Sequence, residues 1–309
     1  MTDAPQRVLV TGCGGYLANA LLPHLRANWP KVHLAGVGHN AAGSQDWDAL
    51  HEAELCDTEA MAALLTKLRP DVVLHAAGRL SSQDWSLLYR DNVQSTLSLL
   101  AAVRRAAPSA RTVVVGSAAE CGMVPADELP VREHHPLRPV SPYGVSKSWQ
   151  RLAALSQSWH GVDVCVARLF NIVGPRMPGT TSLGAFARQL RDIAAGNRPP
   201  VLDVGDLSPR RDFLDVADIG SALAALATGG RSGELYNVCR GSSVTIAEAL
   251  NRMIAASGLT VQLRTDDTRL RAADVPDVYG DATKLAAATG WKPLVPLDDS
   301  LRALVTSLA

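Results

Sequence analysis

A tyrosine and a lysine four residues apart, Tyr143 and Lys147, form the pair with the clearest chemical potential in the sequence. Val145, Trp149 and Leu152 lie at helical spacing around them, so we expect a helix on which Tyr143 and Lys147 share one face. An ammonium group near a phenol favours the phenolate and lowers its pKa from about 10 toward physiological pH. The pair predicts an acid–base catalyst, although two surface side chains on one helix would have the same spacing.

A glycine-rich turn near the N-terminus predicts a site for the phosphates of a dinucleotide. The expected strand Arg7 to Thr11 ends in Gly12-Cys13-Gly14-Gly15, and a helix is expected from Tyr16 to Leu25. Backbone N–H groups at a helix N-terminus bind anions, and glycine lets a phosphate approach. A tight loop would also use glycine, but the flanking strand and helix favour cofactor binding, with Ala18 in place of a third glycine. The expected cofactor-binding residues here are Gly12, Gly14, Gly15, Tyr16 and Leu17.

The end of the second expected strand, 32–37, indicates which dinucleotide binds. An acidic residue there would contact the ribose diol of NAD, but the position is Gly38, which favours NADPH. His39 follows as a partial substitute for an arginine that would bind a 2′-phosphate. Asp57 either meets the adenine or caps the next helix. After the expected strand 71–74, a turn of small residues offers the cofactor a surface at Ala76 and Ala77.

Strands alternate with helices over about 170 residues, which predicts an α/β fold with a Rossmann-like, doubly wound parallel sheet. We expect residues 1–175 to form the NAD(P)-binding domain, with the segment of about 210–240 returning to it. Residues 176–309 should form mainly a smaller C-terminal α/β lobe for the substrate. Ligands of such sheets lie beyond the carboxyl ends of the strands, so Ser117 and Tyr143 should meet at that edge.

Composition excludes several classes of partner. The chain has 309 residues, and its 30 basic side chains balance 30 acidic ones, so no overall field indicates a nucleic acid or a membrane surface. No apolar stretch approaches the roughly 20 residues of a membrane span. Its 5 cysteines form no CxxC pair, and no histidines cluster at ligand spacing. We expect a cytoplasmic protein without a metal, nucleic-acid or membrane partner.

In order, these motifs resemble the extended short-chain dehydrogenases/reductases that modify nucleotide sugars, the NAD-dependent epimerase/dehydratase family. The resemblance runs from about residue 7 to 301 and also rests on His75-Ala76-Ala77, Asn92-Val93, Arg168-x-Phe170-Asn171-x-x-Gly174-Pro175-Arg176 and Arg211-Asp212-Phe213. It implies that Ser117, Tyr143 and Lys147 are catalytic. It further implies that the cofactor contacts Asn92, Tyr143 and Lys147, and that the substrate contacts Asn171, Arg176, Arg211 and Arg271.

The same resemblance implies a homodimer that pairs the helix opened by Asn92 with the helix opened by Tyr143. Apolar residues on these helices permit such a contact but would equally pack on the sheet: Leu97, Leu100, Ala101, Leu152 and Leu155.

Longer stretches are most similar to the GDP-4-dehydro-6-deoxy-D-mannose reductases: 116–123, 137–147, 211–219, 236–239 and 269–276. This similarity implies NADPH-dependent reduction of a C4 ketone to give GDP-D-rhamnose, and Glu120 matches the pattern without an assigned role. Ala118 and Ala119 replace the acids of a 4,6-dehydratase, and Ala118 replaces the cysteine of an epimerase-reductase. Three alternatives stay open. They are an NAD-dependent 4-epimerase, a ketoreductase for a dTDP- or UDP-sugar or of opposite C4 stereochemistry, and a cofactor-sensing regulator.

Overall fold

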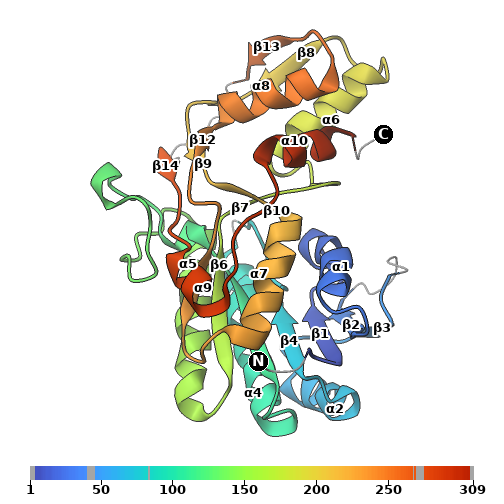
Figure 1. Ribbon diagram of the computed structural model, residues 1–309, viewed down its shortest axis with the longest axis vertical. Helices are drawn as coiled ribbons and strands as arrows, with labels where there is room; N and C mark the ends of the chain where they lie inside the picture. The colour runs from blue at the N-terminus through green and yellow to red at the C-terminus, as the bar shows by residue number, and fades with distance from the viewer. Residues whose placement is uncertain (1–3, 40–45, 83, 267, 269–274, 307–309) are drawn as a thin grey trace.

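The computed structural model describes residues 4–39, 46–82, 84–266, 268 and 275–306, and its central feature is a parallel sheet (Figure 1). The strand order is β11-β6-β5-β4-β1-β2-β3, and every neighbouring pair is parallel. The order reverses between β1 and β4, where the crevice beyond the strand ends takes ligands. The strands are β1 (Arg7–Thr11), β2 (His33–Gly38), β3 (Ala49–Glu52), β4 (Val72–His75), β5 (Arg111–Ser117), β6 (Val164–Leu169) and β11 (Leu235–Val238). The predicted doubly wound sheet is confirmed.

Helices cover both faces of this sheet because its strands are apolar on both sides. In β1, Val8 and Val10 belong to the core on one face and Leu9 to the core on the other. The first face is covered by α1 (Tyr16–Asn28), α7 (Val216–Gly229) and α9 (Thr283–Thr289). The second is covered by α2 (Thr58–Leu68), α4 (Ser95–Ala106) and α5 (Pro142–Ser156). The short α3 (Trp85–Leu88) and the π-helix η1 (Tyr89–Gln94) precede α4.

A smaller α/β lobe lies at the top of Figure 1 and has its own apolar core. It contains α6 (Ser182–Ala194), α8 (Ile246–Ser257), α10 (Leu297–Thr306) and the parallel pair β8 (Val201–Val204) and β13 (Gln262–Thr265). Between lobe and sheet lie two strand groups: β7 (Asn171–Val173) with β10 (Phe213–Asp215), and β12 (Val244–Thr245) with β9 (Arg210–Arg211) and β14 (Asp277–Val278). The chain therefore leaves the sheet after β6 and returns to its edge at β11.

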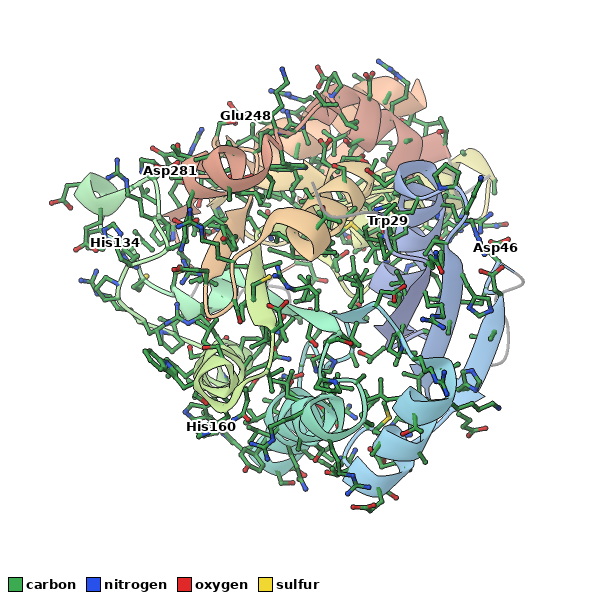
Figure 2. The ribbon with its side chains drawn as sticks, turned by 60° about the horizontal axis from the view of Figure 1, so that its bottom comes forward. Trp29, Asp46, His134, His160, Glu248 and Asp281 are labelled. Carbon is green, nitrogen blue, oxygen red and sulfur yellow. The ribbon has the colours of Figure 1, made fainter. Side chains whose placement is uncertain are left out.

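An excursion, residues 122–141, projects from the body between β5 and α5, and His134 lies on it (Figure 2). It contains the short helix η3 (Ala126–Glu128). Two further short helices lie outside it: η2 (Ala118–Glu120) just before the excursion, and η4 (Gln157–His160) after α5. Among the helices built from the described residues, none is both long and apolar enough to cross a bilayer.

Candidate active site

Tyr143 and Lys147 lie one turn apart in the first half of α5. The start of this helix is fixed by Ser141, whose hydroxyl accepts a hydrogen bond of 3.1 Å from the Gly144 amide, and by Pro142 in the first turn. Lys147 is buried, and its Nζ donates a 2.7 Å hydrogen bond to the carbonyl of Val115 on β5. The expected helix is present, and it holds the ammonium group against the strand that ends at Ser117.

Ser117 is the last residue of β5 and is hydrogen-bonded to Tyr143. Its Oγ also accepts a hydrogen bond of 3.2 Å from the Ala119 amide, which caps η2 and orients the side chain. The end of β5 and the start of α5 therefore bring the three expected catalytic side chains to the carboxyl edge of the sheet. Their chemical roles stay predictions.

The pKa of Tyr143 departs from the sequence expectation. Burial raises the pKa of Tyr143, the hydrogen bond with Ser117 opposes this rise, and the charge of Glu120 adds to it. Lys147 does not lower the pKa of Tyr143. Burial lowers the pKa of Lys147 itself to about 8, and the charge of Glu120 acts in the opposite direction. Burial therefore shifts the two pKa values in opposite directions, raising that of the Tyr143 phenol and lowering that of the Lys147 ammonium group.

The glycine turn fits the phosphates of a dinucleotide. Gly12 has φ +77, and a Cβ there would lie 2.8 Å from the Cα of Ala77, so the turn packs directly against the segment after β4. Gly15 caps α1 without any side-chain hydrogen bond, and Gly14 and Gly15 are exposed. A helix N-terminus without a side-chain cap leaves backbone N–H groups for an anion.

Tyr16 and Leu17, expected at the cofactor, are both partly buried. Leu17 packs against the core on the α1 face of the sheet. A Cβ at Gly174 would lie 3.0 Å from the Tyr16 hydroxyl, so this side chain reaches toward the expected substrate loop. Burial, with the charge of Asp215 in addition, raises the pKa of Tyr16 to about 12.

Two side chains expected at the adenosine end have protein neighbours in the structure, and one of these neighbours was not indicated by the sequence. The Asp57 carboxylate caps α2, accepting a 3.0 Å hydrogen bond from the Ala60 amide, which is one of its two expected roles. His39 is exposed, and its Nε2 lies 3.5 Å from the Glu54 carboxylate. Glu54 therefore brings a negative charge to the end of β2, where the sequence has glycine instead of an acid.

Asn92 lies fully buried in η1, and its amide holds other parts of the protein. Its Oδ1 accepts from the Arg79 amide at 2.7 Å, and its Nδ2 donates to the Arg79 carbonyl at 3.0 Å and to Ser146 Oγ at 2.8 Å. Asn92 thus ties the segment after β4 to α5, the helix that carries Tyr143 and Lys147. Its direct contact with the cofactor stays a prediction.

A buried polar chain that the sequence did not reveal runs beneath the cofactor turn. His75 Nδ1 lies 2.8 Å from Thr11 Oγ1, and its Nε2 lies 2.8 Å from Thr96 Oγ1. The Thr96 hydroxyl donates to the Asn92 carbonyl and accepts from Gln150, so His75 Nε2 carries the proton. Burial lowers the pKa of His75 to about 3. The sequence signal that could have indicated this chain is the polar residue at the end of two apolar strands, Thr11 in β1 and His75 in β4.

Three of the four expected substrate residues lie at or next to β7 and β9, between the sheet and the lobe: Asn171, Arg176 and Arg211. Asn171 opens β7, and its backbone N–H donates to the Asp212 carbonyl at 2.9 Å. Arg211 donates through Nη1 to the carbonyl of Val275 at 2.6 Å. Arg176 has φ +57, a left-handed conformation that is unusual for a residue with a side chain. Arg271 lies outside the described residues.

A buried cluster of charges, also missed from the sequence, lies near Tyr143 and Lys147. Glu120 and Arg168 are fully buried, and Glu120 Oε1 pairs with Arg168 Nε. Arg151 Nε lies 3.5 Å from Glu120 Oε2. Arg168 Nη1 also donates to Asn237 Oδ1 at 3.2 Å and to the Arg132 carbonyl at 3.3 Å. The cluster connects η2, β6, α5, β11 and the excursion.

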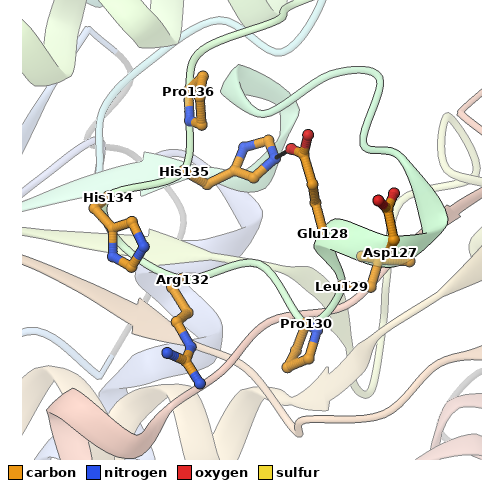
Figure 3. A pocket seen from close by; sticks show the side chains of 8 residues that line it. All are labelled: Asp127, Glu128, Leu129, Pro130, Arg132, His134, His135 and Pro136. Atoms are coloured by element: carbon orange, nitrogen blue, oxygen red, sulfur yellow. Dashed lines mark hydrogen bonds and ion pairs between the residues drawn. The ribbon is translucent and has the colours of Figure 1, made fainter.

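A cavity of about 350 Å³ lies on the excursion and is lined by Asp127, Glu128, Leu129, Pro130, Arg132, His134, His135 and Pro136 (Figure 3). His135 Nε2 lies 2.8 Å from the Glu128 carboxylate, as the dashed line in Figure 3 marks. No expected catalytic residue lines this cavity, so it is separate from the edge at which Ser117 and Tyr143 meet.

Comparison with known proteins agrees with this architecture. The model of the NAD dependent epimerase/dehydratase family matches residues 8–239. The chain is 32% identical to GDP-6-deoxy-D-mannose reductase of Pseudomonas aeruginosa over 97% of this chain and 96% of the relative. It is 29% identical to dTDP-6-deoxy-L-talose 4-dehydrogenase (NAD(P)(+)) of Kitasatospora kifunensis, covering 98% and 96%.

Among solved structures, RMD from Pseudomonas aeruginosa complexed with NADPH superposes with a TM-score of 0.83 at 31% identity, covering 98% of each chain. The chain therefore belongs to the NAD dependent epimerase/dehydratase family. It is an NAD(P)-dependent enzyme of the extended short-chain dehydrogenase/reductase type, as its sequence predicted.

Proposed function

We propose that this enzyme reduces the C4 ketone of a nucleotide-linked 4-keto-6-deoxyhexose with NADPH, converting GDP-4-dehydro-6-deoxy-D-mannose to GDP-D-rhamnose. The observation that carries the proposal is the meeting of Tyr143, Ser117 and Lys147 at one edge of the sheet, with Ala118 and Ala119 where other reactions need an acid or a thiol. The 32% identical relative named as a GDP-6-deoxy-D-mannose reductase supports this choice of substrate.

Each catalytic side chain has one task in this reaction. The dinucleotide supplies the hydride when it is bound to the glycine turn. Ser117 donates a hydrogen bond to the ketone oxygen, and Tyr143 gives its proton to that oxygen as negative charge develops there. Lys147, held by the Val115 carbonyl, keeps a positive charge beside Tyr143 and the nicotinamide ribose. Asn171, Arg176, Arg211 and Arg271 would bind the substrate, with the arginines matching its diphosphate.

The choice of NADPH over NADH rests on Gly38 at the end of β2 and on the NADPH in the similar Pseudomonas structure. The His39–Glu54 pair works against the 2′-phosphate, so the preference should be modest. Competition between NADPH and NADH at equal concentrations measures it directly.

The deciding experiment follows NADPH and NADH consumption with GDP-4-dehydro-6-deoxy-D-mannose generated in situ and identifies the product by NMR. GDP-D-rhamnose would establish reaction, nucleotide and stereochemistry together. The talose dehydrogenase relative makes the dTDP-linked ketosugar and the opposite C4 configuration the second substrate test. If neither reduced cofactor is consumed, the reductase is ruled out, and nucleotide sugars are tested for C4 epimerisation with bound NAD.

Replacing Arg176 with asparagine should raise KM for the nucleotide sugar about tenfold, since a charge-assisted hydrogen bond contributes about 1.5–3 kcal/mol. Asparagine tolerates the left-handed backbone, so the free energy of unfolding should change by less than about 1 kcal/mol. Steady-state kinetics and thermal unfolding measure both effects. Arg69→Asn is the matched control because Arg69 also has positive φ, 48°, at the end of α2. An unchanged KM for Arg176→Asn would remove Arg176 from the substrate site.

We also propose a homodimer that buries an exposed aromatic face. The ring centroid of Trp149 on α5 lies 6.4 Å from the ring centroid of Trp85 on α3 and 6.3 Å from that of Tyr89 on η1. These three side chains and Leu152 are exposed, whereas Leu100 is fully buried against the sheet. Exposed apolar patches of this kind mark protein interfaces.

Trp149→Glu should therefore convert the dimer to a monomer in analytical ultracentrifugation, because it places a charge at the centre of this face. Trp159→Glu is the control, since Trp159 is 90% exposed on η4 and does not belong to the group formed by Trp85, Tyr89 and Trp149. Dissociation by both variants, or by neither, would contradict this interface.

A further inference from the structure

His75 joins two threonine hydroxyl groups that belong to different parts of the site. Its Nδ1 lies 2.8 Å from Thr11 Oγ1, at the end of β1 next to the glycine turn, and its Nε2 lies 2.8 Å from Thr96 Oγ1 on α4. All three side chains are fully buried. Water therefore cannot replace a lost partner, and each contact fixes the separation of the two groups that it joins.

The hydrogen bonds along this polar chain all run in one direction. The Ala77 amide donates to Thr11 Oγ1 at 3.2 Å, and the Thr11 hydroxyl donates to His75 Nδ1, which carries no proton because Nε2 does. His75 Nε2–H then donates to Thr96, whose hydroxyl donates to the Asn92 carbonyl at 2.7 Å. A neutral imidazole supplies the acceptor on one ring nitrogen and the donor on the other. Hydrogen bonds aligned in this way strengthen one another.

One end of the polar chain holds the glycine turn. Thr11 immediately precedes Gly12, and a Cβ at Gly12 would lie 2.8 Å from the Cα of Ala77. The Thr11 hydroxyl, which accepts from the Ala77 amide, therefore fixes the turn against the segment after β4. This turn is where the cofactor phosphates are expected to bind.

The other end of the polar chain holds α5. Gln150 on α5 donates through Nε2 to Thr96 Oγ1 at 2.9 Å. Asn92, whose carbonyl ends the polar chain, donates through Nδ2 to Ser146 Oγ at 2.8 Å. Ser146 and Gln150 lie on either side of Lys147 in the sequence of α5. The polar chain therefore fixes the part of the helix that carries the expected catalytic lysine.

We propose that His75 is a positioning residue that sets the distance between the glycine turn and α5, and with it the position of the bound cofactor relative to Tyr143. The turn and the helix come from different segments of the protein, and the two ring nitrogens of His75 connect them. Groups that act on one carbonyl must be held in a fixed relative position, since a misplacement of about 1 Å can cost about a hundredfold in rate. This role rests on the proposed function, which makes Tyr143 the acid.

Two substitutions of His75 cut the polar chain at different ends. The amide of His75→Gln reaches the position of Nε2 and keeps a donor for Thr96, but it leaves Thr11 without an acceptor. The shorter amide of His75→Asn reaches the position of Nδ1, keeps an acceptor for Thr11 and loses Thr96. His75→Gln should weaken NADPH binding about tenfold in a fluorescence titration, with kcat within about threefold of the parent. His75→Asn should bind NADPH within about threefold of the parent and lower kcat at saturating NADPH by about tenfold or more.

Isosteric changes keep the test decisive if a histidine variant does not fold. Thr11→Val and Thr96→Val each remove one hydroxyl group and should reproduce the effects of His75→Gln and His75→Asn, respectively. Thr112→Val is the matched control, since Thr112 is fully buried on β5 and its hydroxyl has no hydrogen-bond partner within the described part of the protein. This control should leave both NADPH affinity and kcat unchanged.

The two ends of the polar chain must differ in their effects. Equal changes of NADPH affinity and kcat in Thr11→Val and Thr96→Val, or changes no larger than those of Thr112→Val, would show that the polar chain only stabilises the fold and would overturn the role of His75. If the parent reduces no ketosugar, the proposed function fails, but the NADPH titrations still decide. Weaker binding by Thr11→Val alone supports the role, and equal affinities of the two variants contradict it.

Discussion

Tyr143→Phe should lower kcat for ketosugar reduction by a factor of about 10² to 10⁴, the range that general acid catalysis contributes. The substitution removes one hydroxyl group, and with it the proton that the ketone oxygen receives. Neighbouring acids offer no replacement, because Ala118 and Ala119 follow Ser117. NADPH oxidation followed by absorbance measures the loss, with the product identified by NMR.

Two observations separate a chemical role of Tyr143 from a structural one. NADPH affinity, measured by fluorescence titration, should change less than about threefold, since the cofactor is held mainly at the glycine turn. Tyr89→Phe removes a hydroxyl from an exposed tyrosine on η1 and should leave kcat unchanged. Turnover by Tyr143→Phe at the parent rate would exclude Tyr143 as the acid.

Gly122→Ala should lower the free energy of unfolding by about 3 kcal/mol or more, the sum of a steric clash and a left-handed backbone. Gly122 opens the excursion with φ +56, and a Cβ there would lie 1.7 Å from the Arg138 carbonyl oxygen. The Met123 amide donates to that same oxygen at 3.2 Å. The added methyl group would displace Arg138. Ser141, which caps α5, lies three residues after Arg138, so the start of α5 should move as well and kcat should fall.

Urea unfolding followed by tryptophan fluorescence measures this loss of stability. Gly258→Ala is the matched control because Gly258 has φ +68 at the end of α8, yet a Cβ there meets no atom within 4 Å. It should lose only about 1 kcal/mol, the cost of the left-handed conformation. Equal losses in the two variants would show that the closure of the excursion is not as tight as the structure indicates.

The parts of the fold and site that sequence could predict depend on short-range patterns. The strand, glycine turn and first helix follow one another within one segment, and the helical spacing of Tyr143 and Lys147 is local. Parallel strands then place Ser117 and Tyr143 at one edge without further information.

The features of the site that the sequence did not predict depend on burial and on contacts between residues far apart in the chain. Glu120, Arg168 and Arg151 come from three elements, and no periodicity indicates that they pair inside the protein. The spacing of Tyr143 and Lys147 says nothing about desolvation, which raises the pKa of the tyrosine instead of lowering it. Asn92 occupies its motif position, but its hydrogen bonds run to Arg79 and Ser146.

The return of the chain at β11 determines when the nucleotide-binding sheet can be completed during synthesis. Its edge strand, Leu235–Val238, and the covering helix α7, Val216–Gly229, both follow α6 and β8 of the lobe. Until residue 238 has left the ribosome, β6 is an open parallel edge, and the apolar side of α1 lacks its partner α7. Open edges and uncovered apolar faces are where nascent chains aggregate. The two parts of the enzyme therefore mature together, and a fragment that stops at residue 175 would be a target for chaperones and proteases.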